Sequence, residues 1–465
     1  MNADGLPPVP SQGESATAAA DRRHHLHPWE ALGQWRQAER HVIVRGEGIH
    51  LIDEQGRRLI DGPGGMWCVQ IGYGRQEMAD AMAEQVMRLP YASPWSTAHD
   101  PGAQLAETLA RHAPGALNTV QFTTGGSTAV DTAIRTMHFM NNRLGRPEKK
   151  IVIGREKGYH GSTYLSASVT GKERDRSHFD FETRLVHLLP DVNPFIRPEG
   201  MTEDAWCDAK IADLENAIAT LDPDRVGAFI AEPVLCSGGV VIPPRGYHAR
   251  TLELCRRHDI LYISDEVVTA FGRLGHWFAS QEVFGIEPDM ICCAKGITSG
   301  YQPLGACLIS DRVLERMTGA DHSVLFPNGY TYSAHPVACA AALKNLEIME
   351  REDLFGHVRR VAPRFQERLA ALKASPIIGD ARGMGLLGCL EGLSEAGRAM
   401  PLATQRDLGS RLDAACEARG LIVRPLINMC VFSPPLIISE AEIEAMFDIF
   451  EDALTEVATD IAAGR

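Results

Sequence analysis

One lysine directly follows a short apolar segment in the second half of the chain. Lys295 comes after residues 290–294 (MICCA) and opens a loop of small residues. A lysine at the end of a buried strand is costly, because apolar surroundings penalise the strongly hydrated ammonium group. Two readings are open on this segment alone. The side chain either turns out to solvent, or it has a lowered pKa and forms a Schiff base with a carbonyl compound.

An aspartate ends another apolar segment. Asp265 closes residues 260–265 (ILYISD) and stands 30 positions before Lys295. A buried carboxylate needs a cationic or hydrogen-bonding partner. A protonated pyridine nitrogen is one such partner, and the carboxylate would keep that nitrogen protonated. A salt-bridged or helix-capping aspartate is the alternative.

A glycine pair precedes a helical segment at residues 123–135 (TTGGSTAVDTAIR). Free amides and the helix dipole at Gly126 and Ser127 would make a phosphate site, whereas a tight strand-to-helix turn is the plain alternative. A phosphate cradle, a ring-nitrogen carboxylate and a strand-end lysine are together the three anchors of pyridoxal 5′-phosphate (PLP), an electron-sink cofactor. The set therefore predicts a PLP site.

The elements that would position these residues lie between residues 104 and 336. Apolar segments begin near residues 120, 150, 184, 226, 260, 290 and 305, and helical segments separate them. This alternation predicts a mostly parallel, doubly wound sheet that is buried on both faces. Ligands of such sheets bind at the carboxyl ends of the strands. Polar or small residues stand at those ends: Gly125, Gly126, Ser127, Tyr159, His160, Glu232, Asp265 and Lys295.

The rest of the chain predicts a tail and a second, smaller domain. Residues 1–27 have the composition of a disordered tail, and residues 28–75 contain a hairpin pattern at 41–61. We expect residues 76–336 to form the large domain. Residues 337–465 would complete a small α+β domain, with a capping box at Ser439 and Glu442 before the last helix.

Composition excludes several classes of function. The 465 residues carry a net charge of −14, which argues against a nucleic-acid or anionic-membrane partner. No apolar segment is long enough to span a bilayer, and the N-terminus lacks a secretory h-region, so we expect a cytoplasmic protein. The eleven cysteines form no C-x-x-C pair and predict reduced, buried thiols. We expect no metal site, because residues 22–27 (RRHHLH) have no partner ligands nearby in the sequence and read as solvated.

Five sequence blocks resemble a known family. They are DEVVTAFGRLGHWF at 265–278, AKG at 294–296, GYHG at 158–161, AEPV at 231–234 and YTYSAHP at 330–336. From about Trp29 onward the chain resembles the class III (ω-amino acid) PLP-dependent aminotransferases of fold type I. The resemblance implies an α/β fold with a seven-stranded, mostly parallel sheet in the large domain and a small domain built from both ends of the chain. It also implies a homodimer with shared active sites, and a tetramer is compatible with it.

The resemblance implies a role in cofactor binding for eight residues. Lys295 would carry the cofactor as a Schiff base and move the reacting proton, and Asp265 would pair with the pyridine nitrogen. The others would hold the phosphate (Gly126, Ser127, and Thr331 of the neighbouring subunit), cover the ring faces (Tyr159, Val267) or join the polar network (Glu232).

The resemblance also implies a substrate pocket. Trp67 would wall the amine site together with Tyr159. Arg424 matches a mobile arginine that clamps the carboxylate of the acceptor and swings away for uncharged amines. A core tryptophan and a surface ion-paired arginine are the alternatives at these two positions.

Two departures from the family pattern bear on cofactor binding. Ala270 stands where the family has glycine, so the backbone there must avoid positive φ or accept strain. The phosphate turn reads GGSTA at 125–129 instead of SGSEA, which keeps the backbone amides but loses one hydroxyl and one carboxylate.

Three functions follow in order of support. The first is a ping-pong aminotransferase that moves an amino group from a primary amine or ω-amino acid to an α-keto acid, with pyruvate as the expected acceptor. The second is a racemase, aminomutase or decarboxylase, because the same fold hosts these reactions. The third is a non-catalytic scaffold, against which the complete set of anchors argues.

Overall fold

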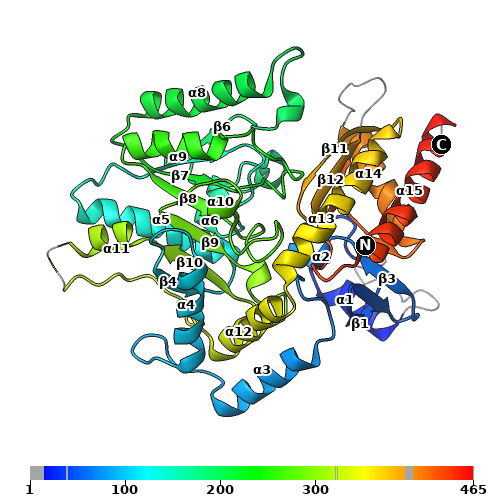
Figure 1. Ribbon diagram of the computed structural model, residues 1–465, viewed down its shortest axis with the longest axis horizontal. Helices are drawn as coiled ribbons and strands as arrows, with labels where there is room; N and C mark the ends of the chain where they lie inside the picture. The colour runs from blue at the N-terminus through cyan, green and yellow to red at the C-terminus, as the bar shows by residue number, and fades with distance from the viewer. Residues whose placement is uncertain (1–14, 38–39, 320, 322, 393–401, 464–465) are drawn as a thin grey trace, which may run out of the picture.

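The computed structural model describes residues 15–37, 40–319, 321, 323–392 and 402–463. Figure 1 separates a part built around a large sheet from a part that brings together the two ends of the chain. These are the large and small domains that the sequence predicts. Among the described helices, none has the combination of length and hydropathy that a membrane span requires.

The large domain contains a seven-stranded sheet with the strand order β4-β10-β9-β8-β7-β5-β6. Every strand matches an apolar segment expected from the sequence: β4 (Thr119–Thr123), β5 (Ile151–Arg155), β6 (Val186–Leu189), β7 (Val226–Ala231), β8 (Leu261–Asp265), β9 (Met290–Cys293) and β10 (Gly305–Ile309). β10 runs antiparallel to both of its neighbours, β4 and β9, and the other pairs are parallel. The expected mostly parallel sheet is confirmed.

Helices cover both faces of this sheet, as a doubly wound fold requires. Ala228 and Ile230 of β7 belong to the core beneath α5 (Gly126–Arg143). Phe229, between them, belongs to the core beneath α8 (Glu203–Leu221) and α9 (Tyr247–Arg257). Successive side chains of a strand point to opposite faces of the sheet, so the side chains of a continuously apolar strand belong to both cores.

Shorter elements complete the large domain. They are α3 (Gln76–Arg88), α4 (Asp100–His112), α6 (Tyr164–Val169), α7 (Glu173–Arg176), η1 (Pro194–Ile196), α10 (Ala279–Glu282), η2 (Lys295–Ile297) and α11 (Asp311–Thr318). The next helix, α12 (Pro336–Arg351), packs against both α3 and α4 and leads the chain to the other part of the molecule (Figure 1).

The small domain contains two four-stranded sheets. One joins the ends of the chain, with β1 (Ile43–Glu47), β2 (His50–Asp53), β3 (Arg58–Asp61) and β13 (Leu421–Ile422). The other consists of β11 (Ile378–Met384), β12 (Leu387–Gly392), β15 (Met429–Phe432) and β14 (Arg424–Leu426). Its helices are α2 (Gly64–Trp67), α13 (Leu354–Ala371), η3 (Leu372–Ala374), α14 (Leu402–Glu417) and α15 (Glu440–Ala462). Ser439 and Glu442 form the expected capping box.

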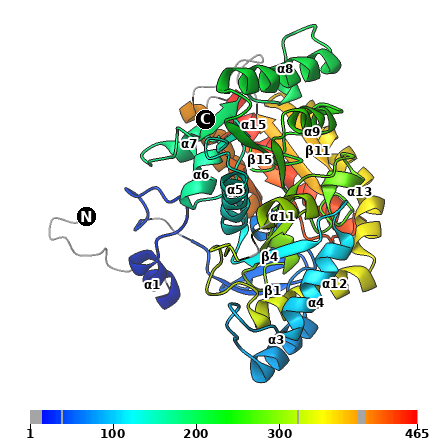
Figure 2. The ribbon, with the colours of Figure 1, turned by 90° about the vertical axis from the view of Figure 1, so that its left-hand side faces the viewer.

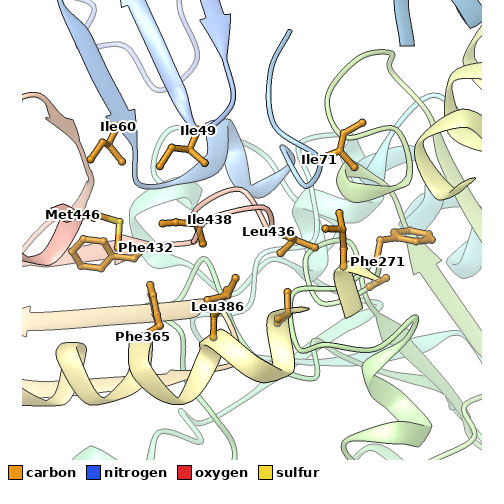
Figure 3. Close-up of a cluster of buried hydrophobic side chains, with 14 of the residues drawn as sticks. Ile49, Ile60, Ile71, Phe271, Phe365, Leu386, Phe432, Leu436, Ile438 and Met446 are labelled. Carbon is orange, nitrogen blue, oxygen red and sulfur yellow. The ribbon is translucent and has the colours of Figure 1, made fainter. Parts of the chain in front are cut away.

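One hydrophobic core connects the small domain with the interdomain region. Figure 3 shows Phe432 of β15 and Met446 of α15 between Ile60 of β3 and Phe365 of α13. Phe271, in the loop after β8, belongs to the same cluster. The same cluster includes Ile291 of β9, so one continuous core joins the small domain to the large sheet.

The N-terminal segment differs from the sequence prediction. Within residues 1–27, expected to be disordered, Ala16–His24 forms helix α1 (Figure 2), which Ser15 caps; residues 1–14 lie outside the described range. Asp21 of this helix contacts His25 (2.9 Å) and His27 (2.9 Å), so the expectation of no potential ligand beside residues 22–27 is wrong. The alanine-rich segment has high helix propensity, and the contact between Asp21 and His25 has the i,i+4 spacing of neighbours on a helix.

Candidate active site

The carboxyl ends of the parallel strands meet beside a cavity of about 200 Å³. Eight of the ten residues predicted to serve the site line this cavity: Trp67, Gly126, Ser127, Tyr159, Glu232, Asp265, Val267 and Lys295. The two others, Thr331 and Arg424, do not line it. The sheet therefore brings together residues that are more than 200 positions apart in the sequence.

The turn after β4 leaves the start of α5 open. Gly125, the N-cap, provides no side-chain cap, so the first amides of this long helix remain available to an anion. A Cβ on Gly126 would lie 2.9 Å from Cγ1 of Val267, so only glycine allows Val267 to approach this closely. Thr128 donates its hydroxyl to the carbonyl of Gly125 at 2.9 Å and stabilises the turn.

Lys295 begins the η2 turn directly after β9. Its backbone has φ of 44°, a left-handed conformation that costs a non-glycine residue about 1–2 kcal/mol. Asn345 of α12 secures this turn by donating to the carbonyls of Gly296 (2.9 Å) and Ile297 (3.0 Å). Burial lowers the pKa of Lys295, and Asp265 opposes this effect. The lysine that the sequence singles out is thus held in a strained turn with a lowered pKa.

Asp265 and His160 form a buried pair. Oδ2 of Asp265 lies 2.6 Å from Nδ1 of His160, and Oδ1 accepts the amide hydrogen of Val267 at 3.1 Å. Both side chains are almost completely buried. The two contacts fix the plane of the carboxylate, so that it can face a cationic group in the cavity without rotating.

Glu232 accepts hydrogen bonds from the loop that carries Tyr159. Its carboxylate accepts the amide hydrogens of Tyr159 (2.9 Å) and Cys236 (3.2 Å). Burial raises the pKa of Glu232, and nearby Asp265 acts in the same direction whereas His160 opposes it. Glu232 therefore secures the loop that carries Tyr159.

Aromatic side chains form one wall of the cavity. Nζ of Lys295 lies 5.4 Å from the ring centroid of Trp67, and the guanidinium carbon of Arg424 lies 5.3 Å from the same ring. Trp29, from the N-terminal segment, approaches Tyr159 with a centroid separation of 6.1 Å and also lines the cavity. Trp67 is buried and is therefore a core residue and a wall residue at once.

Comparisons with known proteins give the same answer as the geometry. A family model described as Aminotransferase class-III matches residues 33–454. The chain belongs to this family. The aminotransferase is 36% identical to the putrescine--pyruvate aminotransferase of Pseudomonas aeruginosa, over 96% of this chain and 97% of that protein. It is also 36% identical to the mitochondrial gamma-aminobutyrate transaminase 1 of Oryza sativa subsp. indica, over 98% and 89% of the two chains.

A solved structure has the same fold. The aminotransferase superposes on the omega transaminase of Pseudomonas jessenii in complex with PMP with a TM-score of 0.93, at 34% identity, over 97% of this chain and all of that one. The fold is thus PLP fold type I, and the enzyme is PLP-dependent, as class III aminotransferases are.

The cavity residues fit this cofactor. The uncapped start of α5 suits a phosphate, the fixed carboxylate of Asp265 suits a protonated ring nitrogen, and Nζ of Lys295 suits a Schiff base. Tyr159 and Val267 border the space between these groups. Each of these features exists in the aminotransferase without the cofactor, so the protein provides a preorganised site.

Sequence reasoning assigned no role to His160 or Trp29. His160 belongs to the GYHG block, but its contact with Asp265 spans 105 positions and leaves no local pattern. Trp29 meets Tyr159 only after the N-terminal segment has folded back. Conversely, Ala270 avoids positive φ, and the left-handed position is the next residue, Phe271, with φ of 59°.

Proposed function

We propose that this aminotransferase moves an amino group from a primary amine or ω-amino acid to an α-keto acid, with pyruvate as the acceptor, by a ping-pong route. The observation that carries the proposal is Lys295, a strand-end lysine with a lowered pKa that shares one cavity with the carboxylate of Asp265. PLP, when bound, supplies the electron sink that makes the carbon next to the amine acidic.

The protein's own residues would do the remaining work. With its lowered pKa, Lys295 can take the proton from the amine-bearing carbon of the substrate through Nζ and return it. Asp265 would keep a positive charge on the ring nitrogen, and His160 would hold the carboxylate in position. Gly126 and Ser127 would neutralise the phosphate through their amides, while Tyr159 and Val267 confine the ring.

Arg424 would bind the carboxylate of the keto acid. Its Nη1 contacts only Sδ of Met66, at 2.6 Å, and its buried Nε has no hydrogen-bond partner within the described residues. An arginine without a carboxylate partner beside Trp67 is prepared for an anionic substrate. What supports movement of this side chain is that its contacts, with Met66 and with the ring of Trp67, include no ion pair within the described residues.

We further propose that the enzyme is a homodimer and that Thr331 completes the site of its partner. Thr331 is exposed in the isolated chain. Large apolar side chains are exposed on the same two chain segments: Tyr91 (41%), which donates to the carbonyl of Thr331 at 3.0 Å, Trp95 (88%), Leu325 (77%) and Tyr332 (59%). An exposed apolar surface of this kind supports an interface between subunits.

Domain boundaries and location also remain proposals. We propose that the small domain consists of residues 28–75 and 337–465, supported by the pairing of β3 with β13. A cytoplasmic location is supported by the eleven cysteines, all unpaired and ten of them buried.

The experiment that tests the proposed function is visible absorbance of the purified holoenzyme. We expect a panel of primary amines to bleach the cofactor band without any keto acid, and pyruvate to restore it. Lys295→Ala should abolish turnover while PLP remains bound non-covalently. A band that no amine bleaches, or activity that needs no keto acid, would replace the proposal with a racemase or decarboxylase reaction.

A further inference from the structure

A second lysine lies against the wall of the substrate cavity. Lys172 precedes α7, and its side chain is only 14% exposed. Its Nζ lies 5.7 Å from the ring centroid of Tyr159 and 3.4 Å from Oγ of Ser237. Tyr159 and Ser237 both line the cavity. Lys172 is therefore directly behind the surface that a substrate touches.

The charges around Lys172 do not balance. Asp175 is the only carboxylate within 4 Å of its Nζ in the described residues, and that distance is 3.7 Å. Asp175 also accepts from Nε of Arg174 at 3.0 Å, so one carboxylate is shared by two cations. Oδ2 of Asp175 is buried and has no hydrogen-bond partner in the described residues.

Arg424 adds a third positive charge to this region. Burial and the nearby Arg174 both lower the pKa of Arg424, and the same two causes, with Arg424 itself, lower the pKa of Lys172. These mutual effects mean that the three cations are close enough to repel one another. Asp175 and Glu232 act on Lys172 in the opposite direction, so three cations beside the cavity share two carboxylates.

An excess of positive charge on partly buried side chains attracts an anion that can balance it. The three cations would attract the carboxylate of a substrate that carries one at its far end. They would repel the second ammonium group of a diamine. The two relatives above do not decide between these donors, because one is named for putrescine, the other for gamma-aminobutyrate, and both are 36% identical to this chain.

We propose that Lys172, with Arg174, forms an anion subsite beside the Tyr159 and Ser237 wall of the cavity and selects amine donors that carry a distal carboxylate over diamines. The subsite rests on the proposed transaminase function. It is separate from Arg424, which serves the keto acid, and it acts on the end of the donor away from the transferred amine.

The test compares three four-carbon amines of matched length on the holoenzyme: 4-aminobutyrate, n-butylamine and putrescine. Bleaching of the cofactor band gives the second-order rate constant for each. We expect the wild type to prefer 4-aminobutyrate over putrescine. Lys172→Gln should reduce that ratio about tenfold, and Lys172→Arg should keep it. The ratio of the two rate constants, 4-aminobutyrate over putrescine, is informative because a general loss of folding or activity lowers both rate constants equally.

Lys373→Gln is the matched control. Nζ of Lys373 also lies 3.7 Å from an aspartate, Asp380, but this pair is in the small domain and does not line the cavity. The ratio should be unchanged in this variant. A second readout does not depend on turnover: binding of butyrate to the holoenzyme, measured by calorimetry, should weaken about tenfold in Lys172→Gln.

Two results would overturn the proposed subsite. The first is a wild-type enzyme that prefers putrescine. The second is a Lys172→Gln variant whose rate-constant ratio and butyrate affinity both equal those of the wild type. Failure of the proposed function is distinguishable from both. In that case none of the amines bleaches the wild-type band, and butyrate binding alone decides whether the subsite exists.

Discussion

Nδ1 of His160 lies 2.6 Å from Oδ2 of Asp265, and both side chains are buried. The pair joins the loop after β5 to the end of β8, two strands that are separated by β7 in the sheet. A carboxylate with one oxygen on an imidazole and the other on an amide has a single orientation. His160 is therefore a positioning residue for the proposed ring-nitrogen partner.

Replacing His160 tests this relationship. His160→Asn should lower kcat about 10- to 100-fold, because a hydrogen bond to a charged group contributes about 1.5–3 kcal/mol. The absorbance of the bound cofactor should also change its pH profile, which a purely structural loss would not cause. His112→Phe, a change of similar size on the aromatic stack with Trp277 outside the cavity, is the control. Equal kcat in His160→Asn and wild type would contradict the role.

The phosphate turn offers a matched pair of glycine substitutions. Gly126→Ala would place a methyl group 2.9 Å from Val267, whereas a Cβ on Gly125 meets no atom within 4 Å. Gly125 has φ of 167°, an extended conformation that alanine adopts. We expect Gly126→Ala to weaken PLP binding about tenfold through overpacking, and Gly125→Ala to leave it unchanged. Dialysis followed by PLP titration measures both, and similar losses in the two variants would refute the packing argument.

A substitution of Arg424 should impair the half-reaction with the keto acid and spare the half-reaction with the amine. Arg424→Gln removes the charge proposed to bind the keto acid, so the KM for pyruvate should rise about tenfold. The bleaching rate with an uncharged amine should stay close to the wild-type rate, because that substrate has no carboxylate. An unchanged KM for pyruvate would show that the acceptor carboxylate binds elsewhere.

Subunit mixing tests the shared active site. Lys295→Ala and Thr331→Asp should each be inactive as homodimers, the second because a carboxylate would repel the phosphate of its partner. Refolding the two variants together creates hybrids in which one site has both native residues. We expect about a quarter of the wild-type activity to return, since half of the dimers are hybrid and each has one intact site. No recovery would place Thr331 in the site of its own subunit, and an active Thr331→Asp homodimer would place it outside the site.

The burial of Asp413 should make the free energy of unfolding depend on pH. Burial, followed by the nearby Glu417, raises the pKa of Asp413 to about 6. As the pH rises from about 4 to 6, the unfolded chain loses this proton before the folded protein does, so stability falls. Asp413→Asn should remove this loss and raise the free energy of unfolding at pH 7 by up to about 2 kcal/mol. Melting temperatures at pH 4.5 and 7.5 measure the effect, with Asp407→Asn of the same helix as the control.

The sequence predicts the large sheet because its strands are buried on both faces and therefore continuously apolar. Lys295 and Asp265 stand out against that background, since a charged residue at the end of such a strand is rare. The reversed direction of β10 was not predictable, because the pattern of residues 305–309 (GACLI) is apolar in either direction. Direction depends on the connections and not on the strand itself.

The missed parts of the site are those created by distant contacts. His160 acquires its role from Asp265, and Trp29 from Tyr159, and neither pair shares a local sequence pattern. Lys172 was not noticed because it stands in the polar segment TGKERDR at 170–176, which reads as a surface loop. Only the fold shows that its side chain turns inward, against Tyr159.

The pairing of β3 with β13 has a consequence for how the protein is made. Ile60 and Asp61 pair with Leu421 and Ile422, so this sheet cannot close until nearly the whole chain has left the ribosome. All seven strands of the large sheet are available once residue 309 has emerged. Strands β1 to β3 therefore have an unpaired edge during most of translation, and such an edge is open to pairing with other chains until residues 421–422 arrive.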